Sequence, residues 1–316
     1  MKRYQPHPKQ IEFLSSEVDE LFYGGSRGGG KSFCLAYDAA FKYRSGFGDG
    51  VKISIDYPEY TALLIRRNYV DIEKNFKPIC DSLYLPAGAV WKEKKQCYVF
   101  PSGAVIHLAH MGTKAEVDKY IGGNYHYLGI EEANQFPEEW VEMLKGSIRS
   151  TNLELRPYKR YTSNPGGIGH LWLKNYFIDK CPPKQDGMKY NEEYDTEYPN
   201  LTTGDIYYND EGESRLFIPA FVFDNPSIID NNPQYVKYLK SIKDPVLKKM
   251  WLLGDWDVMG GVYFDEWNVL YHIIRKDEFR LEKGECRIYR GIDYGVTNPF
   301  ACVFIAIFPN GEVGGE

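Results

Sequence analysis

The sequence predicts an α/β fold with a mostly parallel sheet, because three observations agree. Strand-like apolar runs alternate with helix-like segments through the first 225 of the 316 residues. A glycine-rich run, residues 24–32, stands between the first predicted strand and a predicted helix. Apolar residues make up 43% of the chain, enough for a large buried core. Alternation of this kind places parallel strands between two layers of helices.

The individual elements follow from apolar periodicity and from turn residues. Seven segments read as strands: residues 21–23, 62–65, 91–100, 104–109, 125–130, 159–162 and 216–222. Pro101, Ser102 and Gly103 join two of these strands as a hairpin. Four segments have helical spacing: residues 33–43, 70–83, 138–148 and 170–178.

The second half of the chain is organised differently. Residues 181–214 are rich in proline, glycine, asparagine and acids, which predicts a long mobile connection. Prolines predict the starts of two short helices, near residues 233–242 and 245–253. Residues 254–268 read as a packed linker, and residues 286–293 and 300–308 as a new strand pair. We therefore predict a main domain at 1–225, a helical lid and linker at 226–280, and a further fragment at 281–316.

Composition excludes several classes of protein. The net charge of −6 and the pI near 5.7 argue against a protein that coats nucleic acid over its whole surface, although local basic contacts stay open. The six cysteines form no Cys-x-x-Cys pair and no zinc spacing, which favours reduced, structural thiols in a cytosolic protein. We find no apolar signal region and no stretch as long as a membrane span.

The glycine-rich run satisfies the phosphate-loop pattern Gly25-x-x-x-x-Gly30-Lys31-Ser32. Glycines let the backbone curl and aim successive N–H groups at phosphate oxygens, and the following helix adds its positive end. Lys31 would reach the β- and γ-phosphates of ATP, and the Ser32 hydroxyl would bind Mg²⁺. The residues predicted to bind the nucleotide are Gln10, Gly25, Ser26, Arg27, Gly28, Gly29, Gly30, Lys31, Ser32 and Phe33. The alternative is a glycine-rich surface turn beside a lysine.

Two acids follow the predicted strand at 125–130. We expect Glu131 to lie near the Mg²⁺ shell and Glu132 to polarise the attacking water, because ligands bind at the carboxyl ends of strands in open α/β sheets. The alternative is an exposed glutamate pair that caps the helix after Pro137.

Further polar residues stand at strand ends or near the loop. Thr162, Ser163 and Asn164 end a strand and are placed to sense hydrolysis, unless they only open an Asn-Pro-Gly turn. Gln10 is a candidate for the adenine edge, or else a surface glutamine. Arg27, inside the loop, is expected to reach the phosphates or a neighbouring subunit.

Other basic residues have more than one interpretation. Arg66 and Arg67 follow a strand and either brace the site, touch a nucleic-acid backbone or form a solvated strand end. The short runs 92–95 and 248–249 read as solvated faces first and as DNA contacts second.

Residues 290–295, Arg-Gly-Ile-Asp-Tyr-Gly, place Asp293 at a strand end before a glycine turn. This is how RNase-H-like metal nucleases open, and it is also a common turn. Cleavage with two metal ions needs several converging carboxylates, and only the first strands of such a domain are present.

Taken in order, these residues resemble the large terminase subunit of tailed bacteriophages, the motor that packages DNA. The resemblance rests on Gln10, residues 24–32 with Arg27, Arg66-Arg67, Glu131-Glu132, Thr162-Ser163-Asn164, Gly254-Asp255-Trp256 and Asp293. It implies a P-loop ATPase of the additional-strand, catalytic-glutamate class, with ATP and Mg²⁺ as cofactors. Glu132, Lys31 and Arg27 would act in hydrolysis, and residues 162–164 would couple it to movement. Asp293 would be the first metal ligand of an RNase-H-like nuclease, too incomplete in this chain to cut DNA.

The resemblance also implies partners. They are double-stranded DNA, the portal protein of the procapsid and the small terminase subunit. The active form would be a homo-oligomeric ring, with a monomer in isolation. The motor would work in the host cytoplasm, transiently docked on the procapsid and not in a membrane.

The chain departs from the family pattern at two places. Glu131 replaces the usual Asp, so Mg²⁺ would be held at a different reach, through water. The stretch 114–119, where such rings often carry a trans-acting arginine, has only lysines. Lys119, Arg149 or Arg27 acting in cis remain the candidates, although lysine lacks the bidentate fork of arginine.

Two other functions stay open on the sequence. One is a different ATP-driven nucleic-acid enzyme, such as a helicase or repair translocase. The other is a scaffold that binds nucleotide without turnover.

Overall fold

The structure is a computed structural model that describes residues 5–44, 52–258, 286–293, 301–309 and 313–315. The chain forms two compact units, Met1–Gly260 and Gly261–Glu316, and each is described by itself. The predicted lid helices belong to the first unit.

The first unit is built on a nine-stranded sheet with the order β12-β13-β1-β9-β8-β4-β7-β6-β5. The neighbours from β13 to β7 run parallel, whereas β12, β6 and β5 pair antiparallel at the edges. The strands are β1 (Glu20–Gly25), β4 (Thr61–Arg66), β5 (Val90–Lys92), β6 (Cys97–Val99), β7 (Val105–His110), β8 (Tyr127–Glu131), β9 (Tyr158–Ser163), β12 (Tyr207–Tyr208) and β13 (Ser214–Ala220). The predicted α/β fold with a mostly parallel sheet is confirmed, and β9 lies between β1 and β8.

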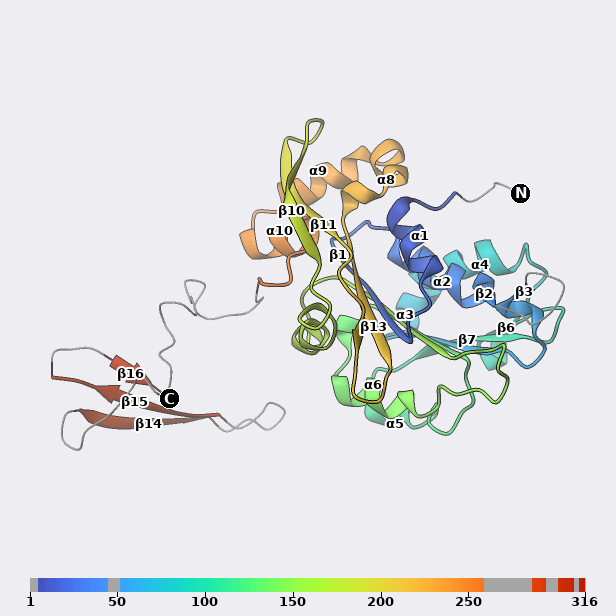
Figure 1. The fold of residues 1–316 in the computed structure, drawn as a ribbon, viewed down its shortest axis with the longest axis horizontal. Helices are drawn as coiled ribbons and strands as arrows, with labels where there is room; N and C mark the ends of the chain where they lie inside the picture. The colour runs from blue at the N-terminus through green and yellow to red at the C-terminus, as the bar shows by residue number, and fades with distance from the viewer. Residues whose placement is uncertain (1–4, 45–51, 259–285, 294–300, 310–312, 316) are drawn as a thin grey trace. The chain divides into compact units, whose positions relative to one another are not determined.

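Helices cover both faces of this sheet (Figure 1). They are α1 (Pro8–Ser15), α2 (Lys31–Phe41), α3 (Tyr69–Asp71), α4 (Lys77–Tyr84), α5 (Lys114–Val117), α6 (Glu138–Lys145) and α7 (His170–Leu173). Alternate residues of β1 point to opposite faces: Leu21 and Tyr23 join the apolar core under α1, α2 and α4, and Phe22 joins the core under α5, α6 and α7. The central strands are therefore buried on both sides, as the parallel arrangement requires.

Several boundaries differ from prediction for local reasons. The predicted strand 91–100 is β5, a 3₁₀ turn over the charged residues 93–95, and β6, with Gln96 at a left-handed φ of 48°. The helix predicted at 138–148 ends at Lys145. The helix predicted at 33–43 ends at Phe41, because Tyr43 joins a small hairpin of β2 (Tyr43–Arg44) and β3 (Lys52–Ile53). The hairpin across residues 101–103 is confirmed by the antiparallel pairing of β6 with β7.

The prediction of a long mobile connection at 181–214 was wrong. Residues of this segment form the hairpin of β10 (Lys184–Asn191) and β11 (Thr196–Thr202), followed by β12. Tyr198 packs on Phe223 at 4.6 Å between ring centroids, and buried Tyr194 packs there too. Those aromatic anchors outweigh the polar composition on which the prediction relied.

Three short helices follow β13: α8 (Pro226–Asn231), α9 (Pro233–Ser241) and α10 (Pro245–Leu252). The two helices predicted from their prolines are confirmed, and α1 and α8 were not predicted. These helices share a small apolar cluster with the β10–β11 hairpin, including Val236, Leu239 and Leu252. Of the predicted linker 254–268, residues 259–268 lie outside the described residues.

The second unit contains a three-stranded antiparallel sheet in the order β14-β15-β16. The strands are β14 (Arg287–Asp293), β15 (Ala301–Ile307) and β16 (Val313–Gly315). The strand pair predicted at 286–293 and 300–308 is confirmed. Across the parts of the chain that the structure describes, no helix has the length and apolarity needed to cross a membrane.

Candidate nucleotide-binding site

The glycine-rich loop joins the end of β1 to the start of α2. Gly25 has a φ of 141°, and a Cβ there would lie 2.2 Å from the carbonyl oxygen of Ala220 on β13. Gly30 has a φ of 73° and caps α2 in the left-handed conformation. The loop is tied to β13 because Ser26 N donates to Ala220 O at 2.8 Å and Val222 N donates to Ser26 Oγ at 2.6 Å. The loop is therefore a fixed cradle that only glycine can form at these points.

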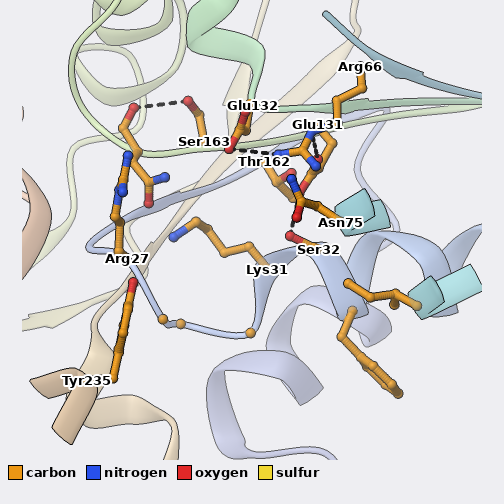
Figure 2. A pocket seen from close by; sticks show the side chains of 16 residues that line it. Arg27, Lys31, Ser32, Arg66, Asn75, Glu131, Glu132, Thr162, Ser163 and Tyr235 are labelled. Atoms are coloured by element: carbon orange, nitrogen blue, oxygen red, sulfur yellow. Dashed lines mark hydrogen bonds and ion pairs between the residues drawn. The ribbon is translucent and has the colours of Figure 1, made fainter. Parts of the chain in front are cut away.

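The cradle opens on a cavity of about 550 Å³ at the carboxyl edge of the sheet (Figure 2). Its walls come from the loop, α2, α4, the ends of β4, β8 and β9, and α9. The lining residues are Arg27, Gly28, Gly29, Gly30, Lys31, Ser32, Phe33, Arg66, Asn75, Ile79, Glu131, Glu132, Thr162, Ser163, Asn164 and Tyr235. The structure thus brings together predicted residues from four separate segments: 27–33, Arg66, 131–132 and 162–164.

Lys31 points into this cavity from the first turn of α2 (Figure 2). Its Nζ donates to the backbone carbonyl oxygen of Ser26 at 2.5 Å. Burial lowers the pKa of Lys31 to about 7, a shift that the charge of Glu131 partly offsets and that of Arg27 reinforces. Among the described residues, the ammonium has no anionic partner at hydrogen-bond distance, so an entering phosphate would supply one.

Ser32 and the two acids form a chain of contacts through Arg66 (Figure 2). Ser32 Oγ donates to Glu131 Oε1 at 2.5 Å, and Arg66 Nε lies 2.6 Å from Glu131 Oε2 as an ion pair that lacks hydrogen-bond alignment. Burial raises the pKa of Glu131 to about 6, although Arg66 and the Ser32 hydroxyl oppose the rise. The protein alone stabilises the ionised carboxylate incompletely, as expected of a side chain that binds a cation.

Glu132 has an unusual backbone. Its φ and ψ are 55° and 51°, the left-handed conformation, which costs about 1 kcal/mol for a residue with a side chain. The side chain is fixed from both sides: Arg66 Nη2 lies 2.9 Å from Oε1, and Gln135 Nε2 donates to Oε2 at 2.5 Å. The strained turn holds a carboxylate at the edge of the cavity.

The end of β9 adds a polar wall. Ser163 Oγ accepts from Asn134 N at 3.1 Å and donates to Asn164 O at 3.0 Å. Thr162 Oγ1 and Asn164 Oδ1 are buried and have no hydrogen-bond partner among the described residues. Buried polar atoms are rarely left unpaired, so this wall is suited to a polar ligand or to ordered water.

Arg27 is held against helix α10. Its guanidinium carbon lies 3.3 Å from the ring centroid of Trp251, and its backbone N donates to Trp251 O at 2.9 Å. Tyr235, from α9, lines the cavity on the same side (Figure 2). The loop therefore contacts helix α10 directly.

Gln10 lies beside the loop and is not part of the cavity lining. It is 4% exposed, and its Nε2 is 2.5 Å from the position that a Cβ of Gly30 would take. Its Oε1 accepts from His7 N at 2.9 Å.

The other predicted basic residues do not line the cavity. Arg67 donates to Gln135 O at 2.5 Å and lies over Trp140, so it braces the turn that follows Glu132. Lys119 is exposed, and Arg149 donates to Asn124 Oδ1 at 2.6 Å near the amino end of β8.

Asp293 is the last residue of β14, in the second unit. Within the described residues, no group of three or more His, Cys, Asp or Glu side chains is arranged to hold a metal ion by itself. Mg²⁺ usually takes one or two protein oxygens and completes its shell with phosphates and water. The Ser32 hydroxyl and the Glu131 carboxylate are such oxygens.

Three residues of the cavity lining, Asn75, Ile79 and Tyr235, were not predicted from the sequence. Asn75 lies in a π-helical turn at residues 72–76, a feature often found at functional sites but without a sequence signature. Tyr235 stands two residues after the proline that starts α9. The only available signal for Tyr235 was that a lid helix begins there.

The fold and this cavity define an α/β protein with a mostly parallel sheet and a glycine-rich cradle at its carboxyl edge. Residues 22–268 match the family model described as terminase large subunit, T4-like virus type, N-terminal. The chain belongs to this terminase large subunit family. The comparison with curated proteins gave no match.

Solved structures of phage terminases share the fold. The large terminase of a thermophilic bacteriophage is similar with a TM-score of 0.57 and 15% identity, over 99% of this chain and 69% of that one. The same phage protein in complex with ADP gives 0.56 and 15%, over 98% and 68%. The large terminase of bacteriophage HK97 gives 0.51 and 10%, over 100% and 63%. At these identities the likeness shows the fold alone.

Proposed function

We propose that this chain is the ATPase part of a DNA-packaging motor, which hydrolyses ATP with Mg²⁺ and drives double-stranded DNA into a procapsid. Family membership supports the motor, and the ADP complex of the thermophilic phage terminase supports a nucleotide ligand. The observation that carries the proposal is the cavity itself. It combines a glycine cradle, an under-partnered lysine, a strained glutamate and unpaired polar atoms of β9.

Each residue would have a distinct part in binding. Backbone N–H groups of residues 28–32 would hold the phosphates, and Lys31 would leave the Ser26 carbonyl for the β- and γ-phosphates. Ser32 and Glu131 would hold Mg²⁺, which supplies charge neutralisation across the β- and γ-oxygens when bound. Gln10 would contact the edge of the adenine ring. Phe33 would line the path between the cavity and the adenine.

Glu132 would accept a hydrogen bond from a water molecule and aim it at the γ-phosphorus. The water oxygen would form a bond to phosphorus while the bond to the β–γ bridging oxygen breaks, and the proton released by the water would pass to Glu132, which gives ADP and phosphate. Arg66 lies between Glu131 and Glu132, pairs with both carboxylates and would keep them oriented. Arg27 would stabilise the developing charge in cis.

Movement and assembly rest on family membership and on the sequence. Residues 162–164 would sense the γ-phosphate and couple its loss to motion. A ring of identical subunits, the portal protein and the small terminase subunit would complete the motor in the host cytoplasm, with Lys119 or Arg149 available to a neighbouring site. Asp293 would serve as a metal ligand of a metal-dependent nuclease.

Two variants test this proposal against a different role for the cavity. Glu132→Gln should bind ATP as wild type does, while kcat falls by about 100-fold or more, because the water loses its base. Lys31→Ala should lose ATP binding. Hydrolysis that survives Glu132→Gln, or affinity that survives Lys31→Ala, would contradict the assignment. Wild type that binds ATP but never turns it over would favour the scaffold.

Unwinding separates the motor from a helicase. The packaging motor should translocate duplex DNA without separating a forked substrate. Measurable strand separation by the wild-type protein would count against packaging.

A further inference from the structure

The segment that follows α10, residues 254–258, lies directly on the phosphate loop. Gly254 has a φ of 64°, and a Cβ there would lie 2.5 Å from Ser26 N and 2.9 Å from the Cα of Gly25. Two residues later, the ring of Trp256 meets the ring of Phe22 on β1 edge-on, with centroids 5.4 Å apart. Trp256 is 6% exposed. The chain therefore leaves the first unit along the strand and loop that form the cradle.

Trp256 is also attached to a second part of the site through His170. The two rings stack with centroids 5.2 Å apart and an interplanar angle of 26°. His170 Nε2 lies 3.1 Å from Trp256 O, and Gly166 N donates to His170 Nδ1 at 2.9 Å. A backbone N–H can only donate, so Nδ1 carries no proton, and Nε2–H donates to Trp256 O. Burial lowers the pKa of His170, in keeping with this neutral ring.

On its other side, the His170 segment is attached to the turn that carries Glu132. Asn134 Nδ2 donates to Gly166 O at 2.9 Å, and Gly169 N donates to Asn134 O at 2.7 Å. The backbone N of Asn134 in turn donates to Ser163 Oγ. One continuous set of hydrogen bonds therefore joins the Glu132 turn, the end of β9 and the segment 254–258.

Another contact of this segment, an ion pair of Asp257 with Lys174, is weaker. Lys174 lies 3.3 Å from Asp257, whose side chain is 87% exposed, and Lys174 also pairs with Asp179 at 2.8 Å. Exposed ion pairs contribute little to stability. The buried His170–Trp256 contact is therefore the stronger attachment.

We propose that His170 is a positioning residue that ties residues 254–258 to the end of β9, so that nucleotide binding at the loop is relayed to the chain leaving the first unit. The relay rests on the proposed function. It adds a route by which nucleotide binding would reach residues 254–258 without passing through α8, α9 and α10. A nucleotide that reorders Ser163 and Asn164 would move Gly166, then His170, and with it Trp256. Without the imidazole, the two segments would respond independently.

Hydrogen exchange of backbone amides tests this relay. In wild type, a non-hydrolysable ATP analogue with Mg²⁺ should change exchange by about tenfold in peptides covering residues 25–32, 163–170 and 254–258. In His170→Ala, the change at 25–32 and 163–170 should persist, and the change at 254–258 should fall to the smaller part carried by the direct contacts of Gly254 and Trp256 with the loop and β1. His170→Gln keeps a donor for Trp256 O and should restore part of the lost change.

His126 provides a matched control. It is also a buried histidine, it accepts the Thr61 N–H at Nδ1 at 3.1 Å, and it stacks on Tyr60 at 5.9 Å and 26°. His126→Ala should lose comparable packing and keep the full nucleotide response at 254–258, which separates a relay from general destabilisation. A His170→Ala response equal to wild type at 254–258 would overturn the relay alone. Absence of any wild-type response at 25–32 would overturn the proposed function and the relay with it.

Discussion

The two ends of the central strands both bury charge, and they do so in opposite ways. At the amino end, Glu20 is fully buried and completely partnered. Tyr161 and Tyr176 donate to its oxygens at 2.9 and 3.0 Å, and Lys145 and Lys159 lie at 3.3 and 3.5 Å. Burial opposes ionisation of Glu20, but the two lysines and two hydroxyls outweigh it and lower its pKa.

At the carboxyl end, the buried groups lack such partners. Lys31 holds only a backbone carbonyl, Glu131 keeps a pKa raised to about 6, and Thr162 Oγ1 and Asn164 Oδ1 are unpaired among the described residues. Burial of charge alone therefore does not identify a functional site. A buried charge with complete partners stabilises the fold, whereas one with incomplete partners is prepared for a ligand.

The largest expected effect comes from removing one lysine at each end. Lys31→Met should lower ATP affinity by about 100-fold or more, because a phosphate loses its cation, and should raise the free energy of unfolding of the nucleotide-free protein. Lys145→Met should destabilise the fold and leave ATP affinity unchanged. Isothermal titration measures ATP affinity, and urea denaturation measures the free energy of unfolding. A loss of ATP affinity in Lys145→Met with a loss of stability in Lys31→Met would contradict the difference between the two ends.

The two buried glutamates should differ in stability. Glu20→Gln should lower the free energy of unfolding by about 2–3 kcal/mol, because Lys145 and Lys159 lose their buried anion. Glu131→Gln should leave it unchanged or raise it at pH 7, since burial already favours the neutral carboxyl. Chemical denaturation measures the free energy of unfolding of both variants. Equal losses of stability would contradict the distinction between Glu20 and Glu131.

The titration of Lys31 provides a further difference between the two ends of the strands. Its lowered pKa of about 7 means that the free protein has released this proton at pH 8, and a bound triphosphate would restore it. ATP binding should therefore take up about one proton at pH 8, and affinity should fall by about tenfold per pH unit above that. Between pH 7 and 10.5 the unfolded chain holds more protons than the folded one, so this lysine makes stability rise with pH. Titration in buffers of different ionisation enthalpy measures the uptake, which Lys31→Met should abolish.

The smallest expected effect concerns the strained turn. Glu132→Gly should stabilise the free protein by about 1 kcal/mol, because glycine adopts φ of 55° without strain, while hydrolysis is lost. Glu132→Gln keeps the strain and serves as the control. Thermal denaturation of the two variants should differ in that direction; a less stable glycine variant would argue against strain at this position.

Much of the fold follows from sequence pattern, and the reasons are local. The apolar run 21–23 and the glycine pattern predict the first strand and the loop, and apolar runs predict β4, β7, β8 and β9 near their observed bounds. The hairpin β10–β11 was missed because its stability comes from aromatic contacts with residues near 223, far along the chain. Helix α1 was missed because, at eight residues, it is too short to show a repeated apolar pattern.

The candidate site was likewise predictable from the sequence only in part. Residues at the carboxyl ends of strands or in the segments after them, such as Ser32, Glu131 and Asn164, meet in one cavity because parallel strands end at one edge. The contacts of Arg27 with Trp251 and of His170 with Trp256 depend on how residues 226–258 fold back over the loop. No periodicity encodes that return, so neither contact was predictable.

The most direct test of the central claim is a crystal structure with Mg²⁺ and a non-hydrolysable ATP analogue. Lys31 Nζ should have left the Ser26 carbonyl for the phosphates, with Ser32 and Glu131 at the metal, and the unpaired atoms of Thr162 and Asn164 should have gained partners. A cavity without nucleotide, or a nucleotide bound while Lys31 still holds Ser26, would contradict the account.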